Sequence, residues 1–289
     1  MFGTRSGIRP GSVAIVTDSC ACIPADVAAR MGIGVVQQQL RIGDEYDDEA
    51  RVPGERIVSA MRGKTPVTTA PPDPGAFFWA YQDAAASGAS AVVSLHVSGR
   101  MSQTCALAKE AATQTNVPVH VLDSGTLGMS LGFAVLAAAR VALAGGSIGQ
   151  VLAIAGVRIA RSTELVHVDT LEYLRRGGRI GAAQHLIGSA FAVKPMLTVR
   201  QGEVAPLDKT VGTERALRKM VDRAITVAGA RPVDMAVEHI GADDRVPGVL
   251  AALRARVANI KELVPVNVTS IITAHVGPGA MGITISPAV

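Results

Sequence analysis

Four short segments rich in hydroxyl side chains are the first candidates for chemistry. We expect them at the carboxyl ends of strands in an open α/β sheet, where such sheets bind ligands. Hydroxyls and backbone amides at helix N-termini bind carboxylate or phosphate. Each segment alone is also explained by helix capping, the commonest role of Ser and Thr; four on one sheet edge make a shared anion site an equal alternative. The segments are Thr17-Asp18-Ser19, Thr68-Thr69-Ala70, Ser98-Gly99-Arg100-Met101-Ser102 and Asp123-Ser124-Gly125-Thr126.

Two further segments combine glycine with charged or titratable side chains. Arg175-Arg176-Gly177-Gly178-Arg179 offers close backbone approach and bidentate donors. It is equally well explained as a helix C-terminus with a glycine stop and arginines that match the helix dipole. His275 precedes the bend Gly277-Pro278-Gly279, where we expect a strand end. A single histidine there is commonly structural, and the glycine-rich bend favours a functional role.

Several enzyme classes are excluded by missing patterns. Gly277, Gly279 and Gly282 match G-x-G-x-x-G, but too close to the C-terminus for a βαβ dinucleotide site. The sequence has no phosphate-binding P-loop, no G-x-S-x-G elbow and no H-E-x-x-H. Its six histidines lack metal-ligand spacing, so we expect no metal and no cofactor. A hydrolase triad of Ser98 or Ser102 with His275 stays open.

The composition is that of a globular protein, with 48% hydrophobic and 18% charged residues. The net charge of +4 comes from the second half and fits an anionic partner or membrane surface. Aromatic residues make up only 3%, which argues against nucleic-acid binding and favours an aliphatic pocket. The apolar run Leu131–Gly145 carries Arg140 and is too short to span a bilayer. We expect a buried helix there and, without a signal peptide, a cytoplasmic protein.

The pattern of elements predicts an α/β protein of two domains. Through residues 1–160, apolar strand-like runs alternate with helical patterns, which is typical of a doubly wound, mostly parallel sheet. Residues 161–289 contain a hairpin around Gln201-Gly202 and a mixed order of elements. This second half is therefore expected to be an α+β domain with antiparallel strands. Asp44–Glu49 is expected to be a solvated acidic loop.

At these motifs the chain closely resembles the DegV family of fatty-acid-binding proteins, the carrier subunits of bacterial fatty acid kinase. The resemblance runs from about Val13 to Ile285. Its most specific segments are Leu171-Glu172-Tyr173-Leu174-Arg175-Arg176-Gly177-Gly178-Arg179-Ile180 and His275-Val276-Gly277-Pro278-Gly279. It implies two α/β domains with a long-chain fatty acid between them.

The resemblance also implies roles for single residues. Thr68 and Ser98 hold the carboxylate, with Thr69 nearby, and His275, followed by Gly277, belongs to the same hydrogen-bond network. Arg179 lies near the phosphate position of an acyl phosphate. Departures from the family pattern are Gly99 in place of a serine, Gln103 in place of a glycine and Cys22 in place of an aspartate. They bear on carboxylate affinity and kinase coupling more than on lipid binding itself.

The implied function is that of a carrier and not an enzyme. Similar proteins deliver the acid to a dihydroxyacetone-kinase-like partner that uses ATP to form acyl phosphate, and exchange the product at the membrane for phospholipid synthesis. About 14 buried methylenes contribute on the order of 11 kcal/mol, so the tail dominates affinity. The helical segment between Gly178 and Pro195 is a candidate lid. A lipid hydrolase and a lipid-sensing regulatory protein without a kinase partner remain alternatives.

Overall fold

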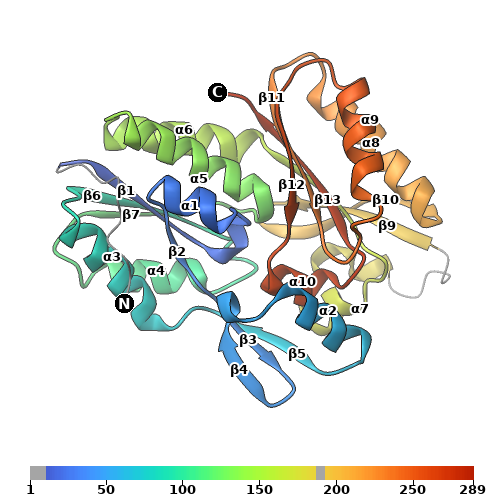
Figure 1. Cartoon of the computed structure of the whole chain (residues 1–289), viewed down its shortest axis with the longest axis horizontal. Coiled ribbons are helices and arrows are strands. Elements are labelled where there is room, and N and C mark those ends of the chain that lie inside the picture. Colours follow the sequence, from blue (N-terminus) through green and yellow to red (C-terminus); the bar gives the residue numbers. More distant parts are fainter. Residues whose placement is uncertain (1–10, 187–192) are drawn as a thin grey trace.

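A parallel four-stranded sheet organises the first half of the chain. The computed structural model describes residues 11–186 and 193–289. Within them the first sheet has the order β2-β1-β6-β7, with every neighbouring pair parallel (Figure 1). Its strands are β1 (Val13–Asp18), β2 (Gly34–Val36), β6 (Ala91–His96) and β7 (Val119–Asp123). β1 and β6 are buried at every position, as expected for central strands covered on both faces.

Helices cover both faces of this sheet, which confirms the predicted doubly wound arrangement. One apolar cluster joins the sheet to α3 (Pro74–Ala86) and α4 (Thr104–Ala112). The other joins it to α1 (Ala25–Arg30), α5 (Gly128–Leu143) and α6 (Ile148–Arg161). Local signals start two of these helices: Asp73 caps α3 ahead of a first-position proline, and Ser147 and Gln150 form a capping box on α6.

Helix α5 is a layer shared by both halves of the molecule. It contacts β1 of the first sheet and β11 and β13 of the second, and Figure 1 shows α5 and α6 lying between the two sheets. Thirteen of its sixteen residues are buried, which explains why the run looks apolar on all sides. The prediction of a buried helix is confirmed. In the described residues, no helix is long and apolar enough to cross a membrane.

The second sheet has six strands of mixed direction, ordered β10-β9-β8-β13-β11-β12. Only β11 and β12 pair in parallel; the other neighbours are antiparallel. An apolar cluster packs the sheet against α8 (Thr213–Ala228) and α9 (Val246–Arg256). The strands are β8 (Thr163–His167), β9 (Val193–Arg200), β10 (Glu203–Val211), β11 (Val233–His239), β12 (Ile260–Asn267) and β13 (Met281–Pro287). The expected hairpin around Gln201-Gly202 is β9–β10.

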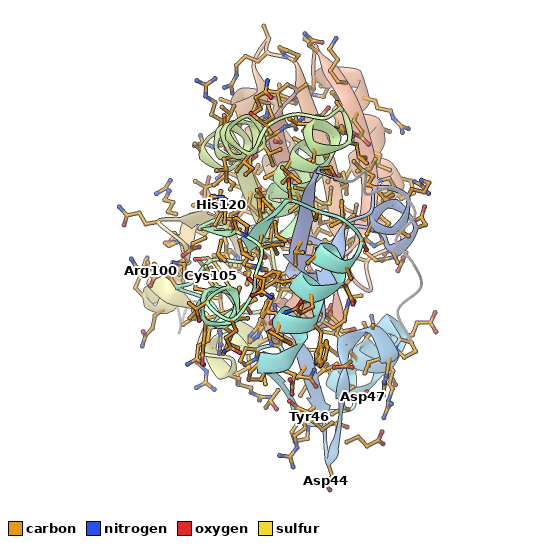
Figure 2. All side chains as sticks on the ribbon, turned by 90° about the vertical axis from the view of Figure 1, so that its left-hand side faces the viewer. Asp44, Tyr46, Asp47, Arg100, Cys105 and His120 are labelled. Atoms are coloured by element: carbon orange, nitrogen blue, oxygen red, sulfur yellow. The ribbon has the colours of Figure 1, made fainter. Side chains whose placement is uncertain are left out.

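A third, small antiparallel sheet was not predicted. Its order is β4-β3-β5, and it projects from the first half beside α2 (Gly54–Arg62), with Asp44, Tyr46 and Asp47 towards its tip (Figures 1 and 2). Its strands are β3 (Gln39–Ile42), β4 (Glu45–Asp48) and β5 (Val67–Ala70). The solvated loop expected at Asp44–Glu49 is therefore wrong, because β4 pairs with β3. Thr68 and Thr69 lie in β5 and not at the edge of the parallel sheet.

The segment before the glycine-rich bend is also different from the prediction. His275 lies in the last turn of α10 (Ser270–Val276), where a strand end was expected. Apolar runs of this length do not distinguish a buried strand from a short buried helix. Helix α10 contacts α2, β3 and β5 of the first half and α7 (Glu172–Arg176) of the second. It therefore joins the two halves of the chain.

The remaining short elements are 3-10 turns. They are η1 (Ser19–Ala21), η2 (Glu49–Arg51) and η3 (Gly181–Leu186). The candidate lid between Gly178 and Pro195 begins with η3, and its residues 187–192 lie outside the described part of the chain. Because α6 ends at Arg161 and β8 begins at Thr163, we propose a domain boundary near residue 160, with domains 1–160 and 161–289.

Candidate functional site

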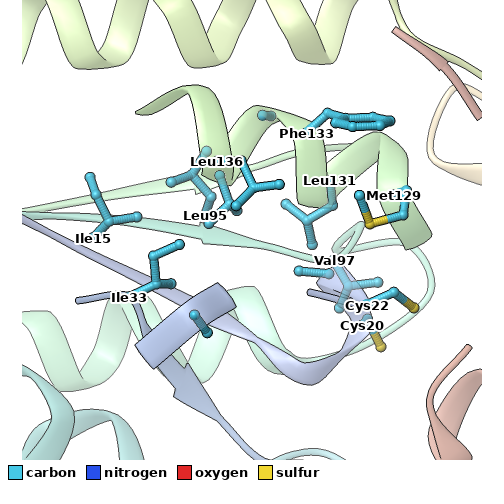
Figure 3. Packing of buried hydrophobic residues seen from close by; sticks show 14 of the residues in the cluster. Ile15, Cys20, Cys22, Ile33, Leu95, Val97, Met129, Leu131, Phe133 and Leu136 are labelled. Atoms are coloured by element: carbon cyan, nitrogen blue, oxygen red, sulfur yellow. The ribbon is translucent and has the colours of Figure 1, made fainter. Parts of the chain in front are cut away.

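An apolar cavity lies where the two halves of the chain meet. Its volume is about 300 Å³, which is at the lower end of the range for small-molecule sites. Its walls come from the loop after β6, the start of α5, α7 and α10. Apolar lining residues include Val97, Met101, Leu127, Leu174, Ile271 and Ile272. Val97 and the neighbouring Cys20, which also lines the cavity, belong to the large apolar cluster of the first half (Figure 3).

A small group of polar side chains also lines this cavity. They are Gln38 before β3, Thr69 on β5, Ser102 and Gln103 before α4, Arg179 after α7, and His275 on α10. His275 Nε2 lies 2.9 Å from Thr69 Oγ1, a hydrogen bond between residues 206 apart in sequence. Apolar walls with a few convergent polar groups are typical of sites that bury an apolar ligand and orient its polar end.

The imidazole of His275 is neutral near pH 7. Burial lowers its pKa to about 4, and the positive charge of Arg179 acts in the same direction. The Arg179 guanidinium is held by two backbone carbonyls: Nε donates to Met101 O over 3.1 Å, and Nη1 donates to Gly177 O over 2.6 Å. The site thus presents neutral hydrogen-bonding groups with one fixed cation beside them.

A second, more polar cleft adjoins this group. It has a volume of about 830 Å³ and shares Thr69, Arg179 and His275 with the apolar cavity. Lys64, Arg176 and the hydroxyl of Thr68 also line it. Thr69, Arg179 and His275 therefore stand between an apolar cavity and a cleft. The described lining of this cleft holds three cations, Lys64, Arg176 and Arg179, and one acid, Glu172, which pairs with Arg176. An anionic group at this position meets a positive field from the cleft.

Comparison with known proteins agrees with this architecture. The model of the DegV family, described as an uncharacterised protein family, matches residues 12–288. The chain belongs to the DegV family. A DegV domain-containing protein of Streptomyces coelicolor is 42% identical over 275 residues, covering 95% of this chain and 98% of the relative. A DegV domain-containing protein of Deinococcus radiodurans is 33% identical, covering 96% and 99%.

Solved DegV structures share the whole fold. A DegV-family protein of Thermus thermophilus, described as binding fatty acid, superposes with a TM-score of 0.91 at 28% identity, covering 96% of this chain and all of that one. DegV of Bacillus subtilis, described as a fatty acid binding protein, gives a TM-score of 0.88 at 26% identity, with coverage of 96% and 100%. Fatty-acid binding is therefore a property found in the DegV family.

The structure brings together three of the predicted site residues of this DegV-family chain and separates three others. Thr69, Arg179 and His275 line the apolar cavity. Thr68, the neighbour of Thr69 on β5, is exposed and lines only the outer cleft of the two. Gly277, at φ +81°, packs against the ring of Tyr173, where a Cβ would lie 2.1 Å from Cδ2. Its role is to let α10 pass close to α7.

Ser98 does not line the cavity, although other residues of its loop do. Its Oγ donates to Gly202 O over 2.7 Å, and the side chain is fully buried under the β9–β10 turn. In the same contact, Arg100 donates to Glu203 Oε1. The family resemblance placed the carboxylate at Ser98, whereas Ser102 was predicted only as part of the hydroxyl-rich segment and as an alternative hydrolase nucleophile. The direction of each hydroxyl depends on how the loop turns, for which the sequence carries no local signal.

The structure shows which groups surround Gly99 and Cys22, two of the residues that differ from the expected DegV pattern. A Cβ on Gly99 would lie 2.7 Å from Asp123 Oδ2, and the Gly99 N–H donates to Asp123 Oδ1. Glycine at this position therefore fits the close approach of Asp123. Cys22, in place of an aspartate, is buried in the apolar cluster (Figure 3), and burial followed by the charge of Glu238 raises the pKa of its thiol.

A triad-like chain exists elsewhere, at Asp18, Ser94 and His96. Ser94 Oγ lies 2.7 Å from His96 Nε2, and His96 Nδ1 lies 3.0 Å from Asp18 Oδ2. All three are fully buried, and Tyr81 OH contacts Ser94 Oγ over 2.9 Å. This chain joins β1, β6 and α3 inside the core. In the described residues, His275 has no hydrogen bond to Ser98 or Ser102.

Another cleft, of about 1080 Å³, adjoins the apolar cavity. Neighbouring residues of the same segments line the two spaces: Cys20 and Ile271 line the cavity, whereas Ala21 and Ser270 line the cleft. None of the six predicted site residues lines it. Within residues 11–186 and 193–289, no group of three or more His, Cys, Asp or Glu side chains is placed to hold a metal ion.

Proposed function

We propose that this chain buries the tail of one long-chain fatty acid in the apolar cavity and presents its carboxylate at Thr69, Ser102 and His275. The observation that carries this proposal is the position of Thr69, Arg179 and His275 at the junction of the apolar cavity and the cationic cleft. Fatty-acid binding by related DegV proteins supports it.

The tail supplies most of the binding free energy. About 14 methylenes contribute on the order of 11 kcal/mol, from which several kcal/mol of immobilisation are subtracted. The carboxylate needs hydrogen bonds to avoid an uncompensated desolvation penalty. Hydroxyls of Thr69 and Ser102 satisfy it without a buried ion pair, which carries a larger desolvation penalty. Arg179 adds a positive charge that is held in place by backbone carbonyls.

The outer cleft gives the carboxylate a route to chemistry performed by a partner. We propose that a separate dihydroxyacetone-kinase-like subunit transfers a phosphoryl group from ATP to the bound carboxylate. The attacking carboxylate oxygen forms the new bond to phosphorus, and ADP leaves. Arg179, Arg176 and Lys64 line the cleft and offset the negative charge of the phosphoryl group. The chain is then a cytoplasmic carrier that exchanges acyl phosphate at the membrane surface for phospholipid synthesis.

Lipid binding is tested on delipidated protein by native mass spectrometry and by titration with a C16–C18 fatty acid. We expect one fatty acid per chain, and a loss of affinity of about 30- to 150-fold in Thr69→Val/Ser102→Ala, because two hydrogen bonds of roughly 1–1.5 kcal/mol each are removed. Thr68→Val is the matched control on the same strand and should bind like the wild type. Absence of bound fatty acid in the wild type contradicts the proposal.

The kinase step is tested separately with a dihydroxyacetone-kinase-like subunit and ATP. Arg179→Gln should retain fatty acid yet form acyl phosphate more slowly, because the cation acts mainly on phosphoryl charge. If the wild-type protein binds fatty acid and no such kinase yields acyl phosphate, the chain is a lipid sensor. Ester hydrolysis by the protein alone, lost in His275→Ala, would instead identify a hydrolase.

A further inference from the structure

The two ring nitrogens of His275 have different surroundings. Nε2 contacts Thr69 Oγ1 at 2.9 Å, whereas Nδ1 is buried and has no hydrogen-bond partner among the described residues. The backbone of Gly177 occupies the space beside Nδ1: a Cβ on Gly177 would lie 2.2 Å from Nδ1 and 2.8 Å from Cε1. A backbone this close leaves no room for a partner between Gly177 and Nδ1.

This environment selects one tautomer of the neutral ring. A neutral imidazole carries one N–H, on either Nδ1 or Nε2. An N–H on Nδ1 would be a buried donor without an acceptor, which costs about 1–3 kcal/mol and is rarer in proteins than an unpaired acceptor. An N–H on Nε2 finds Thr69 Oγ1 at hydrogen-bond distance. In the neutral ring, the hydrogen is therefore on Nε2.

We infer that Gly177 and His275 are positioning residues that set the direction of the Thr69 hydroxyl. Because Nε2–H donates to Thr69 Oγ1, the hydroxyl hydrogen of Thr69 is free to donate to a carboxylate in the cavity. With the opposite tautomer, that hydrogen would point to Nε2, and the lone pairs of Thr69 would face the carboxylate and repel it. The inference rests on the proposed function for the identity of the anion.

The glycine is needed for contact and not for backbone conformation. Gly177 has φ −74° and ψ −5°, which any residue adopts. Its neighbour Gly178 has φ +68°, and a Cβ there would meet nothing within 4 Å in the described structure. The two glycines form a matched pair: Gly177→Ala introduces a clash with the His275 ring without backbone strain, and Gly178→Ala introduces strain without a clash.

The tautomer is measured directly on delipidated protein labelled with ¹⁵N-histidine. We expect the His275 nitrogens to show a protonated Nε2 and an unprotonated Nδ1 from pH 6 to pH 8, with no imidazolium signal in that range. A protonated Nδ1 would overturn the inference. This measurement needs no lipid, so its outcome is independent of whether the proposed function holds.

Binding variants test the consequence of the tautomer. His275→Gln keeps a donor near the position of Nε2, and His275→Asn keeps one near Nδ1. We expect fatty-acid affinity within about threefold of wild type for the glutamine variant and a loss of at least tenfold for asparagine. A structural role alone would affect both variants equally. Equal losses in His275→Gln and His275→Asn would therefore contradict the inference.

A double-mutant cycle completes the test. Thr69→Val should lose about as much affinity as His275→Asn, and the combined variant should lose little more, because both changes remove the same oriented donor. Gly177→Ala should lose affinity with an unfolding midpoint no lower than that of Gly178→Ala, which should bind normally. Additive losses, or normal binding by Gly177→Ala, would overturn the inference. If the wild type binds no fatty acid while Nε2 is protonated, only the proposed function fails.

Discussion

Strand β11 carries two buried acids, four residues apart, whose charges are handled in different ways. Asp234 faces the guanidinium of Arg158 on α6, and Nη2 donates to Asp234 Oδ2 over 2.7 Å. Glu238 instead lies beside a second acid, Glu164 of β8, with Thr284 of β13 between them. The four ionisable residues are each at least 95% buried. On this strand, a cation therefore neutralises Asp234, whereas Glu238 lies beside a second carboxyl group.

A shared proton explains the acid pair. Thr284 Oγ1 lies 2.5 Å from Glu164 Oε2 and 2.7 Å from Glu238 Oε2, yet a hydroxyl has one hydrogen to donate. The other of these two contacts is a hydrogen bond only if one carboxyl group is protonated and donates to Thr284 Oγ1. Burial, followed by the charge of Glu238, raises the pKa of Glu164 well above its usual value. Glu238 Oε1 accepts the Met129 N–H in the first turn of α5.

These two contacts between α5–α6 and the second sheet differ in their sensitivity to pH. An arginine stays charged at all accessible pH values, so the Arg158–Asp234 pair tolerates alkaline solution. A proton leaves as pH rises, so the Glu164–Glu238 pair does not. Because Leu127, next to α5, lines the apolar cavity, the acid pair helps to hold one wall of the proposed lipid site.

The largest effect is expected when the cation is removed. Arg158→Met should lower the free energy of unfolding by about 3–5 kcal/mol, because Asp234 is left buried without a counter-charge. Urea unfolding measures this loss. Arg158→Met/Asp234→Leu is the control and should recover most of it, since the second change removes the unpaired charge. A loss below 1 kcal/mol in the single variant would show that Asp234 is not ionised.

A pH-dependent effect is expected for the acid pair. The folded-state pKa of Glu164 is raised above the unfolded value near 4.5, so the folded state binds more protons between the two values. Stability from this group is complete below pH 4.5 and falls as pH rises towards the raised pKa, by up to about 1.4 kcal/mol per pH unit. Glu164→Gln, which keeps a neutral side chain, should flatten this fall. Urea unfolding at pH 6, 7, 8 and 9 compares the two proteins; parallel curves would rule out the shared proton.

The smallest effect is expected at the edge of the pair. Ser130 Oγ donates to Glu164 Oε2 over 2.9 Å, and Ser130→Ala should lower the free energy of unfolding by about 1 kcal/mol at neutral pH if Glu164 is uncharged. Ser147→Ala, which removes a cap at the start of α6, gives a size reference of about 1 kcal/mol. A loss well above 2 kcal/mol in Ser130→Ala would indicate that Glu164 is charged and would contradict its raised pKa.

Local signals were sufficient for most elements but not for the site. Asp73 ahead of Pro74 and Ser147 ahead of Gln150 mark helix starts because the capping groups are neighbours in sequence. The strand at Glu45–Asp48 and the helix around His275 were missed because pairing with β3, in one case, and burial between the two halves, in the other, decide their conformation. Thr69 and His275 were predicted to belong together through family resemblance, since 206 residues separate them.

The amino-acid sequence by itself determined the parallel first sheet, the hairpin at Gln201-Gly202 and the family, because apolar periodicity, turn residues and short motifs act over a few positions. The tertiary structure alone decided which hydroxyls of the Ser98–Ser102 loop line the cavity and that Gly177 has no room for a side chain. It also decided which acid on β11 pairs with a cation and which lies beside another carboxyl group. These features depend on distances between segments that are far apart in the chain, and no local pattern encodes such distances.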